Sequence, residues 1–163
     1  MHSHDHCCGH DHCEHKEHHH NHSQHHVEEA LEILKEAGYK HTNKRQRLVE
    51  ILNDANRYLS AKQVQELIAP EFPQLSYDTI YRNLYTFVQL NILEETEFNG
   101  EKLFRFRCQS HGHHHHFICE KCGSTKEIDM CPMDFFKEQL EGCEIHSHRF
   151  EIFGLCEKCA SKA

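Results

Sequence analysis

Apolar residues between positions 27 and 88 recur at intervals of three and four, the spacing that places them on one face of a helix. Four such runs follow one another, and each stands beside a residue that begins or ends helices. Their apolar positions are, in chain order, Val27, Ala30, Leu31 and Leu34; Leu48, Ile51, Leu52 and Ala55; Val64, Leu67 and Ile68; and Ile80, Leu84 and Val88. The pattern predicts four short helices, with Thr42, Ser60 and Ser76 as N-caps and Gly38 and Pro70 as stops.

Two extended runs follow the fourth helix, residues 92–98 and 101–107, on either side of Asn99-Gly100. An Asn-Gly pair between such runs is the strongest short-range signal for a hairpin. Helices followed by a two-stranded hairpin describe a winged helix-turn-helix, in which the fourth helix reads DNA and the hairpin is the wing. Residues 27–107 are therefore predicted to form a DNA-binding domain.

Residues 1–26 differ from the rest of the chain, because they hold twelve histidines and three cysteines with almost no apolar residue. Such a segment cannot bury a core, so we expect a disordered tail that binds metal loosely or is an inert solvated extension. An engineered tag is a further interpretation, which the interleaved Cys7, Cys8 and Cys13 and several acidic residues disfavour.

Charge and cysteine usage narrow the class of protein. The net charge of −8 argues by itself against nucleic-acid binding, but residues 39–47 carry four Lys or Arg and no acid, which leaves a basic patch. We find no secretory leader and no apolar run of the roughly 18–20 residues that span a bilayer. We therefore expect a cytoplasmic protein with no membrane partner, in which clustered cysteines bind metal and do not form disulfides.

The composition changes again after Arg107. Two Cys-x-x-Cys pairs enclose 33 residues, in which a helix is predicted at 133–141 and a strand at 147–153. A domain of about fifty residues is too small to be stable on its own core, so it needs a metal, a partner chain, or both. Four thiolates from two such turns suit tetrahedral zinc, and a closed set of four is structural. The predicted ligands are Cys119, Cys122, Cys156 and Cys159.

A run of histidines stands directly before the first Cys-x-x-Cys pair. If residues 113–118 form a strand, successive side chains point to opposite faces. His114 and His116 then share one face, and His113 and His115 the other. One strand could thus contribute to two metal sites, the alternative being a solvated polyhistidine loop.

The winged helix, the motif H-x-H-x-x-C-x-x-C and the second C-x-x-C, in this order, resemble the ferric uptake regulator family of bacterial metal-sensing repressors, and most closely its zinc uptake regulator branch. The resemblance covers residues 27–160. It implies a homodimer in which a DNA-binding domain (27–107) is hinged to a dimerisation domain (108–163), with regulatory metal at the hinge. The implied fold class is α+β, an N-terminal winged helix-turn-helix followed by a small α/β dimerisation domain stapled by zinc.

The resemblance also implies ligands for the regulatory metal. His114 and His116 match the hinge histidines of the family, and Cys108 matches a cysteine that the zinc branch uses. Glu94 lies where that branch places a carboxylate, with Glu95 and Glu97 as alternatives. Iron and peroxide sensors usually carry a histidine before the third helix, where this chain has Tyr58. A thiolate among the ligands favours zinc over manganese or iron(II).

Two further sets of residues match the family. One is an additional metal site, regulatory or structural, made of His113, His115, Asp134 and His148. The other is the DNA-binding set, in which Tyr81 would pack on thymine methyl groups and Arg82 would hold phosphate. Arg45 matches a residue that contacts the DNA backbone, and Lys40 one that reaches toward the minor groove. No role follows for Cys131, Cys143 and His146.

These observations predict a zinc-responsive DNA-binding repressor of zinc-uptake genes, with zinc as its cofactor and a double-stranded operator and a second copy of the chain as its partners. A sensor of iron, manganese or peroxide is the alternative within the family. A zinc-storage or zinc-delivery protein would explain the tail but not the winged helix. An enzyme is disfavoured, because no H-E-x-x-H or comparable catalytic motif is present.

Overall fold

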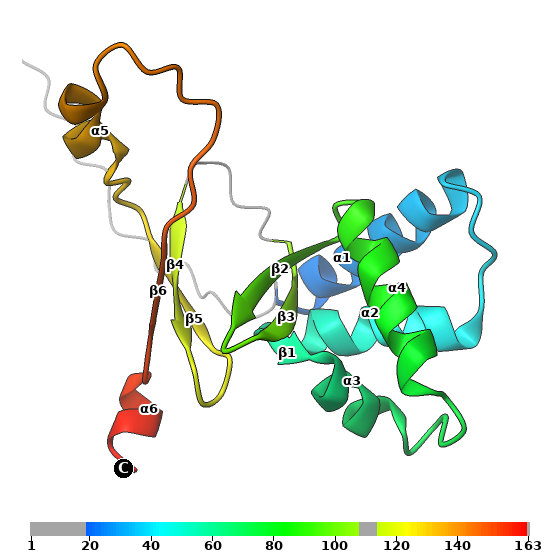
Figure 1. Cartoon of the computed structure of the whole chain (residues 1–163). Coiled ribbons are helices and arrows are strands. Elements are labelled where there is room, and N and C mark those ends of the chain that lie inside the picture. The colour runs from blue at the N-terminus through cyan, green and yellow to red at the C-terminus, as the bar shows by residue number, and fades with distance from the viewer. Residues whose placement is uncertain (1–18, 108–113, 163) are drawn as a thin grey trace, which may run out of the picture.

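The computed structural model describes residues 19–107 and 114–162, which form a helical half and a half built on a small sheet (Figure 1). The helical half contains α1 (His19–Glu36), α2 (Asn43–Ala55), β1 (Leu59–Ser60), α3 (Ala61–Ile68), α4 (Tyr77–Gln89), β2 (Leu93–Phe98) and β3 (Glu101–Phe106). The other half contains β4 (His115–Cys119), β5 (Thr125–Ile128), α5 (Met133–Phe136), the 3-10 turn η1 (Lys137–Leu140), β6 (Glu151–Gly154) and α6 (Glu157–Ala160). The predicted α+β fold class is confirmed. None of the helices in these two ranges is both long and apolar enough to cross a bilayer.

Helices α2, α3 and α4 begin at the predicted caps. The Thr42 side chain accepts a hydrogen bond from the Arg45 N–H at 3.2 Å, and Ser76 accepts one from Thr79 at the same distance. Ser60 forms a reciprocal capping box with Gln63. Each cap satisfies an N–H group that has no partner within its helix. Local hydrogen bonding therefore fixes where α2, α3 and α4 begin.

Helix α1 begins earlier than predicted. It starts at His19, inside the stretch assigned to a disordered tail, and residues 1–18 of that tail lie outside the described residues. Extending an established helix costs little once its first turn exists. The His26 ring also stacks on Phe106 at 6.4 Å, which gives the extension a contact on the wing.

The core of the helical half follows the predicted faces, and it departs from them at one position in α4 and one in α3. Ile80 and Leu84 are fully buried, but Phe87 continues their row and the predicted Val88 is half-buried. Four-residue steps overshoot the helical repeat of 3.6, so the buried face moves to the i+7 position. Leu67 is 45 % exposed, because Ala61, Val64 and Ile68 already form the buried face of α3.

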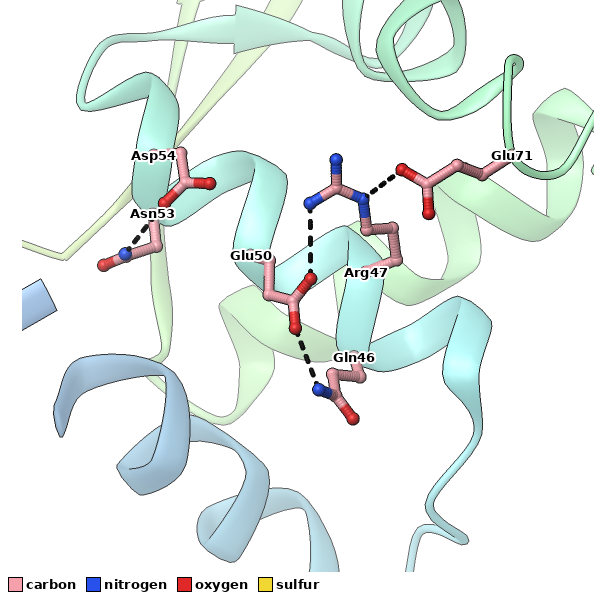
Figure 2. Close-up of polar contacts among 6 residues, drawn as sticks. All are labelled: Gln46, Arg47, Glu50, Asn53, Asp54 and Glu71. Atoms are coloured by element: carbon pink, nitrogen blue, oxygen red, sulfur yellow. Dashed lines mark hydrogen bonds and ion pairs between the residues drawn. The ribbon is translucent and has the colours of Figure 1, made fainter. Parts of the chain in front are cut away.

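Arg47 of α2 forms an ion pair with Glu71 in the segment that follows α3 (Figure 2). Its Nε atom lies 2.6 Å from a Glu71 carboxylate oxygen, and its Nη1 atom lies 3.2 Å from Glu50. Glu50 also accepts a hydrogen bond from Gln46 at 2.8 Å. The guanidinium is about one-third exposed, so these pairs contribute orientation more than stability. The contact holds the two helices before α4 at a fixed angle.

The wing is the predicted hairpin. Strands β2 and β3 pair antiparallel, and Asn99 and Gly100 have φ of 51° and 77°. Positive φ at both central residues is what a type I′ turn requires. The short β1 adds a third strand through the pairing of Leu59 with Phe104, so the sheet order is β1-β3-β2.

The second sheet has the order β5-β4-β6, with β5 antiparallel and β6 parallel to β4. The helix predicted at 133–141 is a single α-helical turn followed by a 3-10 turn. Phe135 is 73 % exposed in the single chain, and helices gain most of their stability from packing an apolar face. The strand predicted at 147–153 is limited to Glu151–Gly154.

The wing packs against the second sheet. The Thr96 hydroxyl donates to the Glu151 carboxylate at 2.8 Å, and Arg149 donates to the Glu95 carbonyl at 3.1 Å. Phe98 and Phe153 stack with ring centroids 5.0 Å apart. The two halves are therefore joined by direct contacts as well as by the chain between them.

Candidate metal centres and nucleic-acid interface

The structure brings the four predicted zinc ligands together. The Sγ atoms of Cys119, Cys122, Cys156 and Cys159 all lie within 4.8 Å of one another. Cys119 is the last residue of β4, and Cys156 precedes α6, so the parallel pairing of β4 with β6 aligns the two Cys-x-x-Cys turns. Four converging sulfur atoms in a partly buried cluster suit a closed tetrahedral zinc site.

Backbone groups favour the thiolate form of Cys119, whereas the hydrogen bond with Cys156 raises the pKa of Cys159. Burial opposes charge on Cys119, but the backbone N–H groups of Cys156, Cys122 and Lys121 lower the pKa of its thiol to about 6. The Cys156 N–H donates to Cys119 Sγ at 3.3 Å. The thiolate, and not the thiol, is the metal ligand, so these backbone groups prepare the site for zinc.

A second group joins His114 and His116 with Glu127, whose ligand atoms also lie within 4.8 Å of one another. His116 and Glu127 are direct partners in the antiparallel pairing of β4 with β5, which brings opposite side chains to the same face. The Nε2 atom of His116 is buried, and no hydrogen-bond partner for it exists among the described residues. Burial lowers the pKa of His116 to about 4, so the ring is neutral near pH 7 and can bind a metal.

Glu94, the predicted carboxylate of this site, has other partners in the structure. It accepts a hydrogen bond from the Tyr58 hydroxyl at 3.2 Å and lies 3.8 Å from the Arg105 guanidinium. Burial raises the pKa of Glu94. The alternative Glu95 pairs with Lys102 at 2.9 Å. Cys108, the predicted thiolate, lies outside the described residues.

Sequence reasoning missed Glu127. Its position opposite His116 depends on strand β5, which is four residues long and shows no apolar alternation. The available signal was the proximity of Glu127 to the Cys-x-x-Cys turn, because a strand that leaves such a turn often returns beside the strand that entered it.

A third group consists of His115, Cys131 and His148. Cys131 Sγ lies 3.3 Å from His148 Nε2, and the rings of His115 and His148 are 5.2 Å apart. Asp134, the predicted carboxylate of this site, is not in the group. It pairs with Lys137 at 2.5 Å on the first turn of α5, and its side chain is 83 % exposed. Cys131 is thus a second ligand candidate that the sequence did not reveal, and His113 lies outside the described residues.

The described histidines before the first Cys-x-x-Cys turn fall into two metal groups, as the alternation of side chains along a strand predicts. His114 and His116 belong to one group and His115 to another, on either side of the sheet. Their rings also show the division, since His114 and His116 meet edge to face at 4.8 Å while His115 contacts Phe150. Strand β4 therefore contributes to two candidate metal centres, and its last residue contributes to a third.

The residues predicted to bind DNA lie on α4 and around the start of α2. Arg82 is 79 % exposed and pairs with Asp78 at 3.0 Å. Tyr81 is half-buried and meets Phe104 of the wing edge to face at 6.1 Å, which leaves it beside an open groove between α4 and the wing.

Arg45 is tied to three neighbours near the start of α2. It donates to Asn83 of α4 at 3.1 Å and to the Lys40 carbonyl, and it lies over the Tyr39 ring at 5.4 Å. These contacts place Arg45 and the Lys40 backbone next to α4. The four predicted residues therefore come from adjoining segments of the helical half.

Comparison with known proteins identifies relatives along most of the chain. The profile of the ferric uptake regulator family matches residues 36–153. The ferric uptake regulation protein of Staphylococcus epidermidis is 46% identical over 135 residues, which are 83% of this chain and 96% of that protein. The protein of the same name from Staphylococcus aureus is 48% identical over 131 residues, which are 80% of this chain and 96% of that protein.

Solved structures show the same fold. The ferric uptake regulator of Helicobacter pylori superposes with a TM-score of 0.65 at 20% identity, covering 85% of this chain and 93% of that one. A zinc uptake regulator in complex with zinc and DNA superposes with a TM-score of 0.63 at 20% identity, covering 86% and 96%. At such identities the superposition supports the architecture and not the choice of metal.

Proposed function

The chain belongs to the ferric uptake regulator family, and on that premise we propose that it is a zinc-responsive repressor of zinc-uptake genes. Members of this family are metal-dependent, DNA-binding transcription regulators and not enzymes.

The group of His114, His116 and Glu127 carries the proposal. Two imidazoles and one carboxylate leave room for a fourth ligand, and we propose Cys108, which stands six residues before His114 in the segment that links the wing to β4. A thiolate beside two imidazoles suits zinc better than iron(II) or manganese. Glu94 is the competing carboxylate, held here by Tyr58 and Arg105.

Tyr58 supports zinc over iron. The iron and peroxide sensors that the sequence resembles usually place a histidine at this position. Burial raises the pKa of Tyr58, which therefore stays protonated, and its hydroxyl donates to Glu94. Tyr58 is thus a hydrogen-bond donor at the hinge and not a metal ligand. The curated relatives are named for ferric uptake regulation, which makes iron the alternative that the experiment must exclude.

Coupling to DNA follows from where these residues lie. Cys108 stands two residues after the end of β3 in the wing, whereas His116 and Glu127 lie on β4 and β5 and His114 directly precedes β4. A divalent ion held by all four would tie the wing to the second sheet. Metal would then favour one orientation of the wing relative to the second sheet. This is a population shift toward the arrangement that binds the metal more tightly.

We propose a homodimer formed by the half that begins at residue 108. Its apolar side chains are exposed in the single chain, and a second copy of the chain would cover them. The four-cysteine site would supply structural zinc to this half. Residues 27–107 would form the DNA-binding domain, with Tyr81, Arg82, Arg45 and Lys40 at its operator face. Two such faces related by a two-fold axis suit a palindromic operator.

The third group is proposed to hold an additional zinc ion. Its described candidates are His115, Cys131 and His148, and His113, two residues before His115 in the sequence, is a further candidate donor. Because Cys131 and not Asp134 faces the two histidines, the site has a soft ligand and favours zinc.

One experiment tests the metal. Full-length protein stripped with a chelator is titrated with zinc, iron(II) or manganese, and operator binding is followed by fluorescence anisotropy. Zinc should activate binding at the lowest free metal concentration. Cys108→Ser should need more zinc while it keeps the four-cysteine zinc and the dimer, because a neutral hydroxyl is a poor substitute for thiolate. Stronger activation of the wild type by iron(II), or an unchanged zinc response in Cys108→Ser, would contradict the proposal.

A further inference from the structure

The first Cys-x-x-Cys turn contacts the helical half directly. Arg57 Nη1 donates to the Cys122 carbonyl at 2.9 Å, and the Tyr58 N–H donates to the Gly123 carbonyl at 2.9 Å. Arg57 and Tyr58 lie between α2 and β1, outside the wing hairpin itself. Two successive carbonyl groups of the turn therefore accept hydrogen bonds from two successive residues of the DNA-binding half.

Gly123 makes this approach possible. Its φ is +71°, and a Cβ atom built on it would lie 2.2 Å from the Tyr58 carbonyl oxygen. The Gly123 N–H also donates to the Cys119 carbonyl at 2.8 Å, which closes the turn. No residue with a side chain could occupy this position without moving the two halves apart.

Arg57 and Tyr58, which contact the turn, directly precede β1 and α3 of the DNA-binding half. Tyr58 is 3 % exposed and also donates through its hydroxyl to Glu94 of the wing. Leu59 and Ser60 follow as β1, and Ser60 caps α3, which precedes α4. A displacement of Tyr58 therefore moves the wing and the base of the helix-turn-helix together.

We propose that the four-cysteine site has a second function beyond stapling its own half: the Cys119–Gly123 turn is a docking surface that orients the DNA-binding half. Zinc fixes the backbone of a Cys-x-x-Cys turn, and so it fixes the direction of the carbonyl groups of Cys122 and Gly123. Operator affinity then depends on the structural site through this contact, separately from metal at the hinge. The DNA readout below rests on the proposed function, whereas the contact itself does not.

Arg57→Ala tests the docking without changing any metal ligand. The variant should keep its zinc and its dimeric state, but its zinc-saturated operator affinity should fall roughly threefold to tenfold, as expected for one lost hydrogen bond. Arg57→Lys should recover part of the affinity, since an ammonium group can donate to the same carbonyl. Lys121→Ala is the matched control, because it removes a positive charge from an exposed position on the same turn and leaves both hydrogen bonds in place.

Amide hydrogen exchange of the full-length protein gives a readout that does not involve DNA. The Tyr58 N–H should exchange faster in Arg57→Ala than in the wild type, while the Ile80 N–H, which donates to Ser76 within α4, stays unchanged. Gly123→Ala should give a larger effect of the same kind, and if it fails to retain zinc then Arg57→Ala alone decides.

The outcomes separate this inference from the proposed function. Activation of the wild type by iron(II) and not zinc would remove the proposed metal, yet faster Tyr58 exchange in Arg57→Ala would still support docking. Wild-type operator affinity together with unchanged Tyr58 exchange in Arg57→Ala would overturn the docking function. The same holds for a Gly123→Ala protein that keeps its zinc, its dimer and its operator affinity.

Discussion

At the scale of single residues, burial determines which hinge side chains are ready to bind metal. His116 is half-buried beside Arg105 and His114, and desolvation, the larger cause, together with these two groups lowers its pKa to about 4. No proton has to leave the ring when a metal binds at neutral pH. Arg105 is buried, and two of its guanidinium nitrogen atoms lack hydrogen bonds among the described residues.

The pKa of His116 predicts how the stability of the protein that holds zinc only at the four-cysteine site depends on pH. Between about 6.5 and about 4 the unfolded chain protonates this histidine and the folded protein does not. The unfolded state then binds more protons, so the free energy of unfolding falls as the pH falls through this window. Urea denaturation of His116→Gln should show a weaker decline than the wild type. A constant difference between the two proteins across the window would contradict the shifted pKa.

The choice of carboxylate at the hinge gives a second prediction at this scale. Glu127→Gln should raise the zinc concentration needed for half-maximal operator binding by about tenfold or more, since loss of even an outer-shell partner costs about that much. Glu94→Gln is the matched variant, and it should change the response less because Glu94 is already held by Tyr58 and Arg105. The reverse order of effects would assign the ligand to Glu94.

At the scale of elements, the parts that the sequence predicted are those with local signals. The helices α2, α3 and α4 begin at side-chain caps, and the wing turns at Asn99-Gly100, so a few neighbouring residues suffice to locate them. The four cysteines were recognisable for the same reason.

Elements set by distant partners were not predictable from the sequence in this way. Strand β5 exists because β4 lies beside it, and its register alone brings Glu127 to His116. Cys131 meets His148 because residues 141–150 return across the sheet without regular structure. Asp134 has the carboxylate expected of a metal ligand, but it forms an ion pair with Lys137, which lies one helical turn away. Non-local pairing therefore decided which side chains complete each candidate metal centre.

Helix α4 gives a prediction at the element scale. Arg82 pairs with Asp78 in the free protein, and both side chains are mostly exposed. Arg82→Ala should weaken binding to all duplexes and reduce the salt dependence by about one unit, as the loss of one phosphate contact does. Asp78→Asn should have the opposite effect on affinity, because it releases Arg82 and removes a negative charge. Unchanged binding in both variants would show that α4 does not face the DNA.

At the scale of the whole molecule, the two halves differ in how they are stabilised. The helical half has a continuous buried core, whereas the buried positions among the described residues of the second half are only His115, Ile118 and Cys119 of β4. The second half leaves large apolar side chains exposed, namely Met130, Phe135, Phe136, Leu140, Ile145, Phe150, Ile152 and Leu155. So few buried residues cannot balance the entropy of ordering the chain, and in the proposed function metal and a second copy of the chain would supply what is missing.

Cys119→Ser tests this dependence. Cys119 is the most buried of the four cysteine ligands and receives the Cys156 N–H, so its loss should open the closed site and release its zinc. Binding energy at such a site is folding energy, and the exposed apolar surface should then no longer assemble into a dimer. Zinc content by atomic emission and mass by sedimentation should fall together. Cys143→Ser is the control, because Cys143 is exposed and stands outside the described metal groups. A Cys119→Ser protein that remains dimeric with its full zinc content would show that the second half is stable without this site.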